Sequence, residues 1–154
     1  MNIFFLDRDP TRAAQMLCDK HVVKMTLETA QILSTIVGGP YKPTHQRHPS
    51  VLWAADNPGW VWEHFMALLD EYTYRYGKTH KCAEVARVIA SRLPASPAKL
   101  VTPPAQCMPE TYNHDDPVVA YRDYYCHEKA PFARWERGRA APSWFAPKLS
   151  AATL

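Results

Sequence analysis

Residues 19–31, DKHVVKMTLETAQ, carry the pattern that decides the fold. Residues three and four apart share one face of a helix, so on a helical wheel the polar side chains of this stretch and its continuation form one narrow stripe. The stripe consists of His21, Lys24, Glu28, Gln31 and Thr35, with Lys20 at its edge. The rest of the circumference carries the apolar side chains of the helix, Val23 and Leu27 among them. We therefore predict a helix that is buried on most of its surface.

The polar stripe has two interpretations. Lys24 and Glu28 have the spacing of a common surface ion pair, which suits a solvated face. Alternatively, His21, Lys24 and Glu28 line the floor of a cleft, where a carboxylate can transfer protons and a lysine can hold a phosphate. The narrowness of the stripe favours the cleft, but composition does not decide between the two.

Length and composition indicate one compact domain over residues 1–154. A chain of 154 residues with 47% hydrophobic and 21% charged residues can bury a core of its own. No apolar run approaches the roughly 20 residues of a membrane span, so no membrane partner is expected. The four cysteines form no CxxC pair and follow no signal peptide, which predicts free thiols in a reducing cytoplasm.

Cap and stop signals divide the chain into about four helices and predict a mainly α fold. A short extended segment, residues 2–7, precedes a helical pattern that begins at Asp9-Pro10-Thr11 and runs to about Val37, where Gly38-Gly39-Pro40 ends it. Further helices are predicted from Pro58 to Gly77, over 82–93, and from Pro117 to about Lys129. Residues 41–50 and the proline-rich stretch 94–116 are predicted to be irregular loops.

The final quarter of the chain is basic and aromatic. From residue 118 onward it has six basic and three acidic residues, which accounts for the whole net charge of +3. Aromatic rings interleaved with arginines suit a surface that stacks bases and neutralises phosphates, although such rings can also close a small core. We expect Arg134, Arg137 and Trp144 at a nucleic-acid-binding surface. Tyr121 and Tyr125, one helical turn apart, are expected in the core.

The loop THQRHP, residues 44–49, offers a third candidate site. His45, Arg47 and His48 would contact phosphate, or they are loop side chains in solvent. A metal-dependent nuclease would use His45 and His48 with a carboxylate. No histidine or cysteine pair has the HxxxH or CxxC spacing typical of zinc sites, so no metal or other cofactor is expected.

Five stretches together resemble a family of short proteins that tailed bacteriophages encode, a family without an assigned activity. They are DKHVVKMTLE, THQRHP, EYTYRYGKTH, DPVVAYRDYY and FARWERGRAAPSWF. The chain is also distantly similar to the phage pyrimidine-dimer DNA glycosylases of the endonuclease V type, which are short and mostly helical. Their first long helix carries a D-x-H-x6-E pattern, which Asp19, His21 and Glu28 match. Residues 142–145, PSWF, are similar to their closing segment.

The more distant resemblance implies a DNA- or nucleotide-processing enzyme that cleaves an N-glycosidic bond. In that family the carboxylate at the position of Glu28 is catalytic, and an amine attacks C1′ of the sugar to form a Schiff base. The family's amine is the α-amino group of a threonine exposed by removal of the initiator methionine. This chain begins Met1-Asn2 instead, and asparagine is usually too bulky to allow that removal.

Several groups are therefore candidates for the nucleophile. The Met1 amine would serve, or Lys24 and after it Lys20, or the lyase step is absent. His21 and Lys20 would hold phosphate or orient Glu28. The rival hypothesis is a non-catalytic phage counter-defence protein that binds a nucleotide or a host protein.

Overall fold

The computed structural model describes residues 1–95 and 99–146, which contain six α-helices and no β-strand. The chain is therefore mainly α, as the sequence pattern predicts, with more helices than the four expected. The helices are α1 (Pro10–Met16), α2 (Asp19–Val37), α3 (Pro49–Asp56), α4 (Pro58–Tyr76), α5 (Ala86–Arg92) and α6 (Pro117–Tyr124). Between and after them lie 3-10 turns at Lys81–Val85 and Glu110–Tyr112 and a π-helical turn at Tyr125–Lys129.

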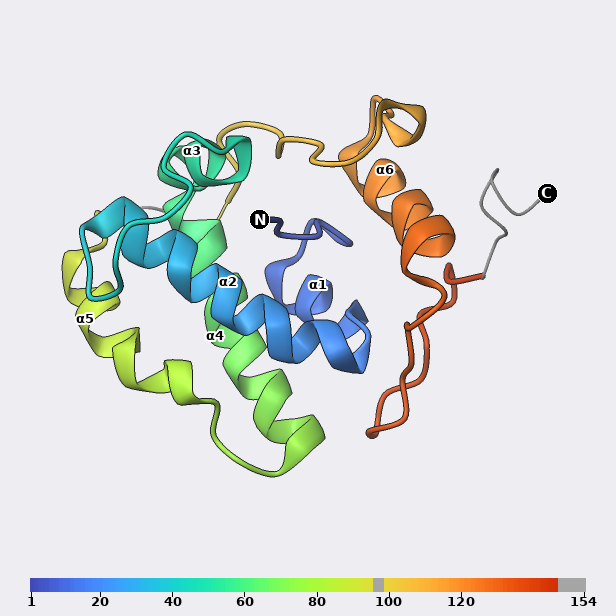
Figure 1. Ribbon diagram of the computed structural model, residues 1–154, viewed down its shortest axis with the longest axis horizontal. Helices are drawn as coiled ribbons and strands as arrows, with labels where there is room; N and C mark the ends of the chain where they lie inside the picture. The colour runs from blue at the N-terminus through green and yellow to red at the C-terminus, as the bar shows by residue number, and fades with distance from the viewer. Residues whose placement is uncertain (96–98, 147–154) are drawn as a thin grey trace.

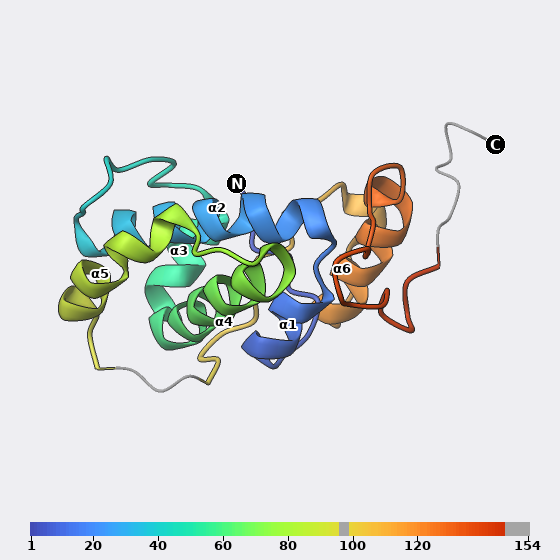
Figure 2. The same ribbon diagram turned by 90° about the horizontal axis from the view of Figure 1, so that it is seen from below.

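The two longest helices, α2 and α4, form the centre of the molecule. In Figure 2, α2 lies above α4 and α1. Helix α1 packs against α4, while α3 and α5 pack against α2. Helix α6 lies on the opposite side of the molecule from α5, and the N-terminal segment runs between α6 and α2 (Figure 1). The largest fully buried side chains come from the N-terminal segment, α2, α4, α5 and the α6 region, and include Phe5, Trp60, Phe65, Tyr121 and Tyr125.

Most helix ends follow local signals in the sequence. Helices α1 and α6 each begin at a proline, after Asp9 and Asp116, whose side chains accept a hydrogen bond from a backbone N–H of the first turn. Gly38 and Gly77 end α2 and α4 with φ of 82° and 69°, a conformation that glycine adopts without a steric penalty. The predicted ends at residues 37 and 77 and the start at 117 are therefore confirmed.

The predicted continuous helix over residues 10–37 is wrong, because the chain breaks between α1 and α2. Leu17 and Cys18 have extended backbones and are completely buried. Carbonyl groups released at the break find a partner elsewhere in the chain, since the Arg75 guanidinium donates to the oxygen of Leu17 at 2.7 Å and to that of Gln15 at 2.8 Å. The amphipathic pattern of the sequence continues across the break, because it carries no information about a partner elsewhere in the chain. The pattern therefore predicts one helix where the structure has two.

Other elements also differ from the prediction. Residues 49–56, to which the sequence pattern assigns no helix, form α3. The helix predicted over 82–93 begins as the 3-10 turn and becomes α-helical only at Ala86. The extended segment 2–7 forms no strand, and Phe4 within it has a positive φ of 57°.

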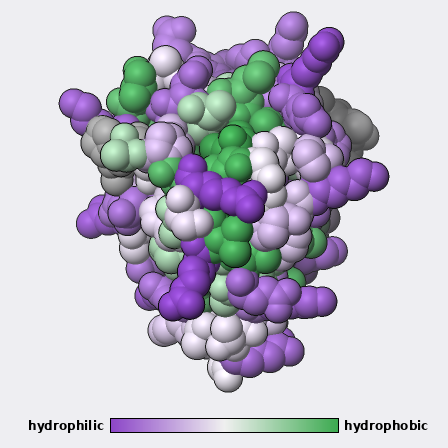
Figure 3. Space-filling model, turned by 90° about the vertical axis from the view of Figure 1, so that its left-hand side faces the viewer, coloured by the Kyte–Doolittle hydropathy of each residue, from purple (hydrophilic) through white to green (hydrophobic). Residues whose placement is uncertain are grey.

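The end of the molecule at which α5 lies shows a mixed surface. Apolar side chains gather in the middle of this face, and hydrophilic side chains project around and across it (Figure 3). Of the helices that the structure describes, none combines the length and the apolar character needed to cross a membrane.

Candidate functional site

The amino terminus lies against the middle of α2 (Figure 1). The α-amino nitrogen of Met1 is 3.9 Å from Oε1 of Glu28, and the side chains of the two residues are 3% and 17% exposed. Charges that are partly shielded from water interact more strongly than an exposed ion pair does. At this separation a small movement or one bridging water allows proton transfer between the amine and the carboxylate. Glu28 therefore occupies a partly enclosed site and not an open, solvated face.

His48 approaches the same pair from the start of α3. Its Nδ1 accepts a hydrogen bond from the backbone N–H of Ser50 at 3.1 Å, which caps the helix. Burial lowers the pKa of His48, and the positive charge of the chain's amino terminus lowers it further, as does His45. The charge of the Met1 amine therefore acts on His48. The fold brings Met1 to Glu28, and His48 lies within the electrostatic range of the Met1 amine.

The other members of the THQRHP loop lie outside this cluster. His45 and Arg47 are exposed, and Nδ1 of His45 is 2.7 Å from the hydroxyl of Thr44. The rings of His45 and His48 are 6.3 Å apart, but Nδ1 of His48 is already occupied by the cap of α3. Within the described ranges, no three His, Cys, Asp or Glu side chains are placed to share a metal ion.

His21 is enclosed by aromatic rings. Only 4% of the residue is exposed, and its ring lies 4.6 Å from Phe4 and 5.2 Å from Phe132. Its Nδ1 is 2.8 Å from the hydroxyl of Tyr125. Burial and the nearby lysine charges lower the pKa of His21 to about 3. A neutral imidazole brings no positive charge to a phosphate. The positive charge around His21 therefore comes from the lysines near it.

Three lysines surround His21. Lys129, Lys24 and Lys20 all act on its pKa, in this order of effect. Lys24 and Lys20 are exposed on α2, and the ammonium of Lys20 lies 5.1 Å from the ring of Phe132. The ammonium of Lys129, at the end of the π-helical turn, lies 5.7 Å from the ring of Phe4. We call these three residues the lysine rim.

Lys129 is a site residue that sequence reasoning missed. The chain between α2 and the π-helical turn contains most of the protein, and only the packing of the turn beside Phe4 brings Lys129 to His21. Its sequence signal is a lysine at the end of the last helical stretch, where the helix dipole favours a cation in any protein. That signal is too general to identify a site.

The exposed face of α2 is wider than the predicted stripe. Val23 and Leu27, expected among the buried residues, are 39% and 43% exposed. Beside Leu27 a mainly apolar pocket of about 520 Å³ opens between α2, the loop at residues 41–44 and the 3-10 turn at residues 81–85. Lys42 and Lys81 are among its lining residues. The exposed face of α2 therefore connects the Glu28 site to this pocket.

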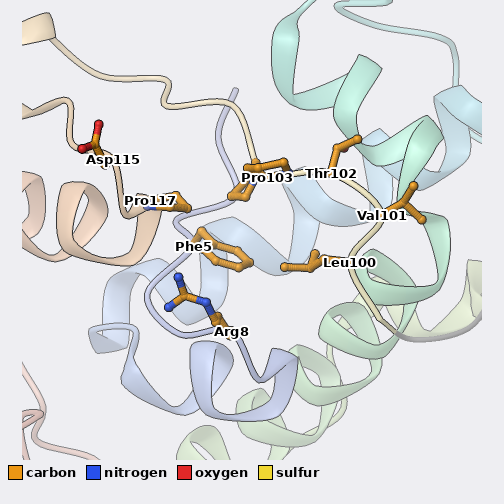
Figure 4. A pocket seen from close by; sticks show the side chains of 9 residues that line it. Phe5, Arg8, Leu100, Val101, Thr102, Pro103, Asp115 and Pro117 are labelled. Carbon is orange, nitrogen blue, oxygen red and sulfur yellow. The ribbon is translucent and has the colours of Figure 1, made fainter.

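A second pocket, of about 350 Å³, lies away from the Met1–Glu28 pair. Phe5, Leu100 and Pro103 line it, with Arg8 and Asp115 among the other lining residues (Figure 4). The guanidinium of Arg8 is already paired with Asp116 at 3.0 Å. Neither Met1 nor Glu28 lines this pocket, so we do not assign it to the site.

The C-terminal arm lies on the helices and leaves only part of itself exposed. Trp144, expected at the surface, is half-buried, with its ring 6.1 Å from that of Tyr125 and its Nε1 3.5 Å from the sulfur of Met16. Arg134 is exposed, and Arg137 is exposed with its guanidinium 4.3 Å from the ring of Tyr76.

Two further expectations concern the same arm. Tyr121 and Tyr125 are buried, as predicted. Lys148, one of the six basic residues of the final quarter, lies outside the described residues.

Comparison with known proteins places the chain in a family. A family model described as pyrimidine dimer DNA glycosylase matches residues 1–84, and no curated protein or solved structure matches the chain. The matched range includes Met1, the whole of α2 and His48, whereas Lys129 lies beyond it. Because the match covers more than half of the 154 residues, the distant resemblance to the pyrimidine-dimer DNA glycosylases is confirmed, and the chain belongs to the pyrimidine dimer DNA glycosylase family.

Proposed function

We propose that this protein cleaves an N-glycosidic bond in DNA, with the α-amine of Met1 as nucleophile and Glu28 as the catalytic carboxylate. The observation that carries the proposal is the separation of 3.9 Å between the two groups at a partly enclosed position on α2. Membership of a DNA glycosylase family supports DNA as the substrate. A pyrimidine dimer is accordingly the first lesion to test.

The chemistry follows from the two groups. The lone pair of the amine forms a bond to C1′ while the bond from C1′ to the base breaks, and the departing base keeps the bonding electrons and takes a proton from the solvent. The sugar develops positive charge in this step, which a fixed carboxylate in a water-poor site stabilises. Glu28 then accepts a proton from the attached nitrogen. Cleavage of the C1′–O4′ bond, with protonation of O4′, leaves an imine between Met1 and the sugar.

The α-amine is a better nucleophile at neutral pH than a lysine side chain. Attack requires the unprotonated amine, and α-amino groups as a class titrate near 7.7–8.0, whereas lysine side chains titrate near about 10.4. Lys24 is exposed on α2, where its ammonium can reach a phosphate. We therefore assign the attack to Met1, and Lys24 to the binding of phosphate.

The lysine rim and the pocket beside Leu27 supply DNA binding. Lys20, Lys24 and Lys129 come from two parts of the chain and place three positive charges around one end of α2, which suits the phosphates of a DNA backbone. A base that leaves the duplex loses a few kcal/mol of stacking and pairing. The mainly apolar pocket beside Leu27 offers such a base a place outside the duplex and offsets part of that cost.

A borohydride trap tests the proposal. The protein is incubated with duplex DNA containing an abasic site, and separately with ultraviolet-irradiated DNA, in the presence of borohydride, which reduces an imine to a stable amine. Mass spectrometry of the adduct is expected to locate the sugar on Met1. Because acid–base catalysis contributes about 10²-fold or more, Glu28→Gln should slow trapping by at least about that factor, whereas Lys24→Gln should act mainly through DNA affinity.

Other results would contradict the assignment in distinct ways. An adduct on Lys24 would move the nucleophile to the helix. If the protein binds DNA but forms no adduct, and a folded Glu28→Gln variant binds DNA as the parent does, the enzymatic proposal is rejected. The hypothesis of a non-catalytic binding protein is then supported.

A further inference from the structure

Asn2 makes three hydrogen bonds at the beginning of the chain. Its Oδ1 accepts from the backbone N–H of Ile3 at 2.7 Å and from that of Phe4 at 2.9 Å. Its Nδ2 donates to the carbonyl oxygen of Cys107 at 2.9 Å. The first two bonds fold the chain tightly around residue 2, and the third ties it to the proline-rich loop. A short amide side chain supplies both the acceptor and the donor that this arrangement needs.

The loop that receives this bond is itself held in place. The backbone N–H of Cys107 donates to the hydroxyl of Tyr121 at 3.2 Å, and that hydroxyl donates to the carbonyl oxygen of Ala105 at 2.6 Å. The sulfur of Cys107 lies 3.2 Å from the hydroxyl of Ser50 on α3. Tyr121 is a buried residue of α6, so the carbonyl that anchors Asn2 is connected to two helices.

Phe4 holds the other end of the same segment. It has a φ of 57°, a region that few residues other than glycine occupy, and its ring is buried against His21 and Tyr125. Residues held in such conformations by their surroundings often lie at functional sites. With Phe4 fixed in the core and Asn2 fixed to the loop, Met1 has little freedom to leave Glu28.

We propose that Asn2 is a positioning residue that holds the α-amine of Met1 against Glu28, an inference that rests on the proposed function. Rate enhancement from fixed geometry is lost when a reacting group is displaced by about 1 Å. A single unanchored residue at a chain end moves over larger distances than that. The resembling enzymes have a threonine after the initiator methionine, whereas this chain has Asn2. We infer that Asn2 helps to hold the Met1 amine in its reactive position.

Two variants and a matched control test the proposal. Asn2→Leu keeps the approximate size of the side chain and removes all three hydrogen bonds, whereas Asn2→Asp keeps the acceptor for Ile3 and Phe4 and removes the donor to Cys107. Asn113→Leu changes an exposed asparagine elsewhere on the surface and serves as the control. The intact mass of each variant verifies that Met1 is retained.

The first readout needs no DNA. An acetylating ester that is selective for amines is applied to the free protein at neutral pH, and the rate of modification of Met1 is followed by mass spectrometry, with Lys24 as the internal reference. Release of the anchor opens the segment locally, so Asn2→Leu should accelerate the modification of Met1 by about tenfold or more. Asn2→Asp should have a smaller effect, and Asn113→Leu none.

The second readout is the rate of borohydride trapping at saturating abasic-site DNA. Asn2→Leu should lower this rate by about tenfold or more while the Kd for DNA changes less than about twofold. If acetylation of Met1 keeps its parental rate in a folded Asn2→Leu or Asn2→Asp variant, the positioning role is overturned. Absence of trapping in the parent protein would overturn the proposed function instead, and acetylation would still decide whether Asn2 holds the amine.

Discussion

Arg75→Met is expected to be one of the most destabilising single substitutions in this protein. The side chain of Arg75 is 0% exposed, and its guanidinium pairs with Glu71 at 2.6 Å and with Asp19 at 3.1 Å. The same group donates to the carbonyl oxygens of Leu17 and Gln15, at the break between α1 and α2. One side chain therefore joins α4 to both the end of α1 and the start of α2, the helix that carries Glu28.

The magnitude follows from the partners that the substitution leaves behind. Removal of one member of a buried ion pair costs about 3–5 kcal/mol, because the remaining charge stays buried without compensation. Here some compensation persists, since Arg139 donates to Glu71 through two bonds of 3.0 Å and the backbone N–H of Glu136 donates to Asp19 at 2.8 Å. We therefore expect a loss near the lower limit, about 3 kcal/mol, which lowers Tm by about 6–12 °C for a chain of this size.

The effect should also depend on pH. Burial alone would raise the pKa of Glu71, but hydrogen bonds from Arg139 and Arg75 hold it below its ordinary value. A carboxyl whose pKa is lower in the folded state stabilises the protein above its unfolded pKa, and this contribution is lost as the pH falls through the folded value. The difference between Arg75→Met and the parent should accordingly be largest near neutral pH and shrink in acid.

Urea denaturation followed by tryptophan fluorescence measures the loss. Arg137→Met is the matched control, because Arg137 is an exposed arginine whose guanidinium lies over the ring of Tyr76 and whose removal should cost no more than about 1 kcal/mol. If Arg75→Met lowers the free energy of unfolding by less than about 1 kcal/mol, or by no more than the control does, the buried network does not hold the helices together as described.

Two further predictions concern buried groups outside the Arg75 network. Tyr125→Phe removes a hydroxyl that accepts from the N–H of Cys18 at 3.1 Å and pairs with His21 at 2.8 Å. The free energy of unfolding, measured by denaturant titration, should fall by about 1–3 kcal/mol. An unchanged value would contradict this role of the hydroxyl. Burial lowers the pKa of His64 from 6.5 to about 4, so the unfolded chain binds the proton more readily than the folded protein does. The free energy of unfolding should therefore decrease by up to about 3 kcal/mol as the pH falls from 6.5 toward 4. His64→Phe should flatten that part of the pH dependence, whereas an unaltered profile would assign it to other groups.

Local sequence signals were sufficient for elements whose ends depend on neighbouring residues. Asp116 and Pro117 start α6, and Gly38 and Gly77 end α2 and α4, because capping and positive φ are properties of a few adjacent residues. The same reasoning missed α3. The cap of that helix is a histidine, His48, which is not among the residues preferred at that position.

The candidate site was only half accessible to sequence reasoning. The pattern around Glu28 and the resemblance to DNA glycosylases predicted Glu28 as the carboxylate and named Met1 among the possible amines. The pattern does not show that rings from Phe4 and Phe132 cover His21, or that Leu27 stays 43% exposed. A helical wheel orders the faces of one helix, but the exposure of each face depends on what packs against it.

By itself, the sequence determined that the chain is mainly α, where α2 and α4 end and α1, α4 and α6 begin, which family it belongs to, and that Glu28 stands on the polar face of the central helix. Tertiary structure alone decided that the helix breaks at Leu17 and Cys18, that Lys129 joins the site, and that Met1 meets Glu28. The physical reason is one of range. Caps, turns and amphipathic faces arise from contacts within a few residues, whereas the break, the lysine rim and the amine depend on hydrogen bonds and packing between segments far apart in the chain.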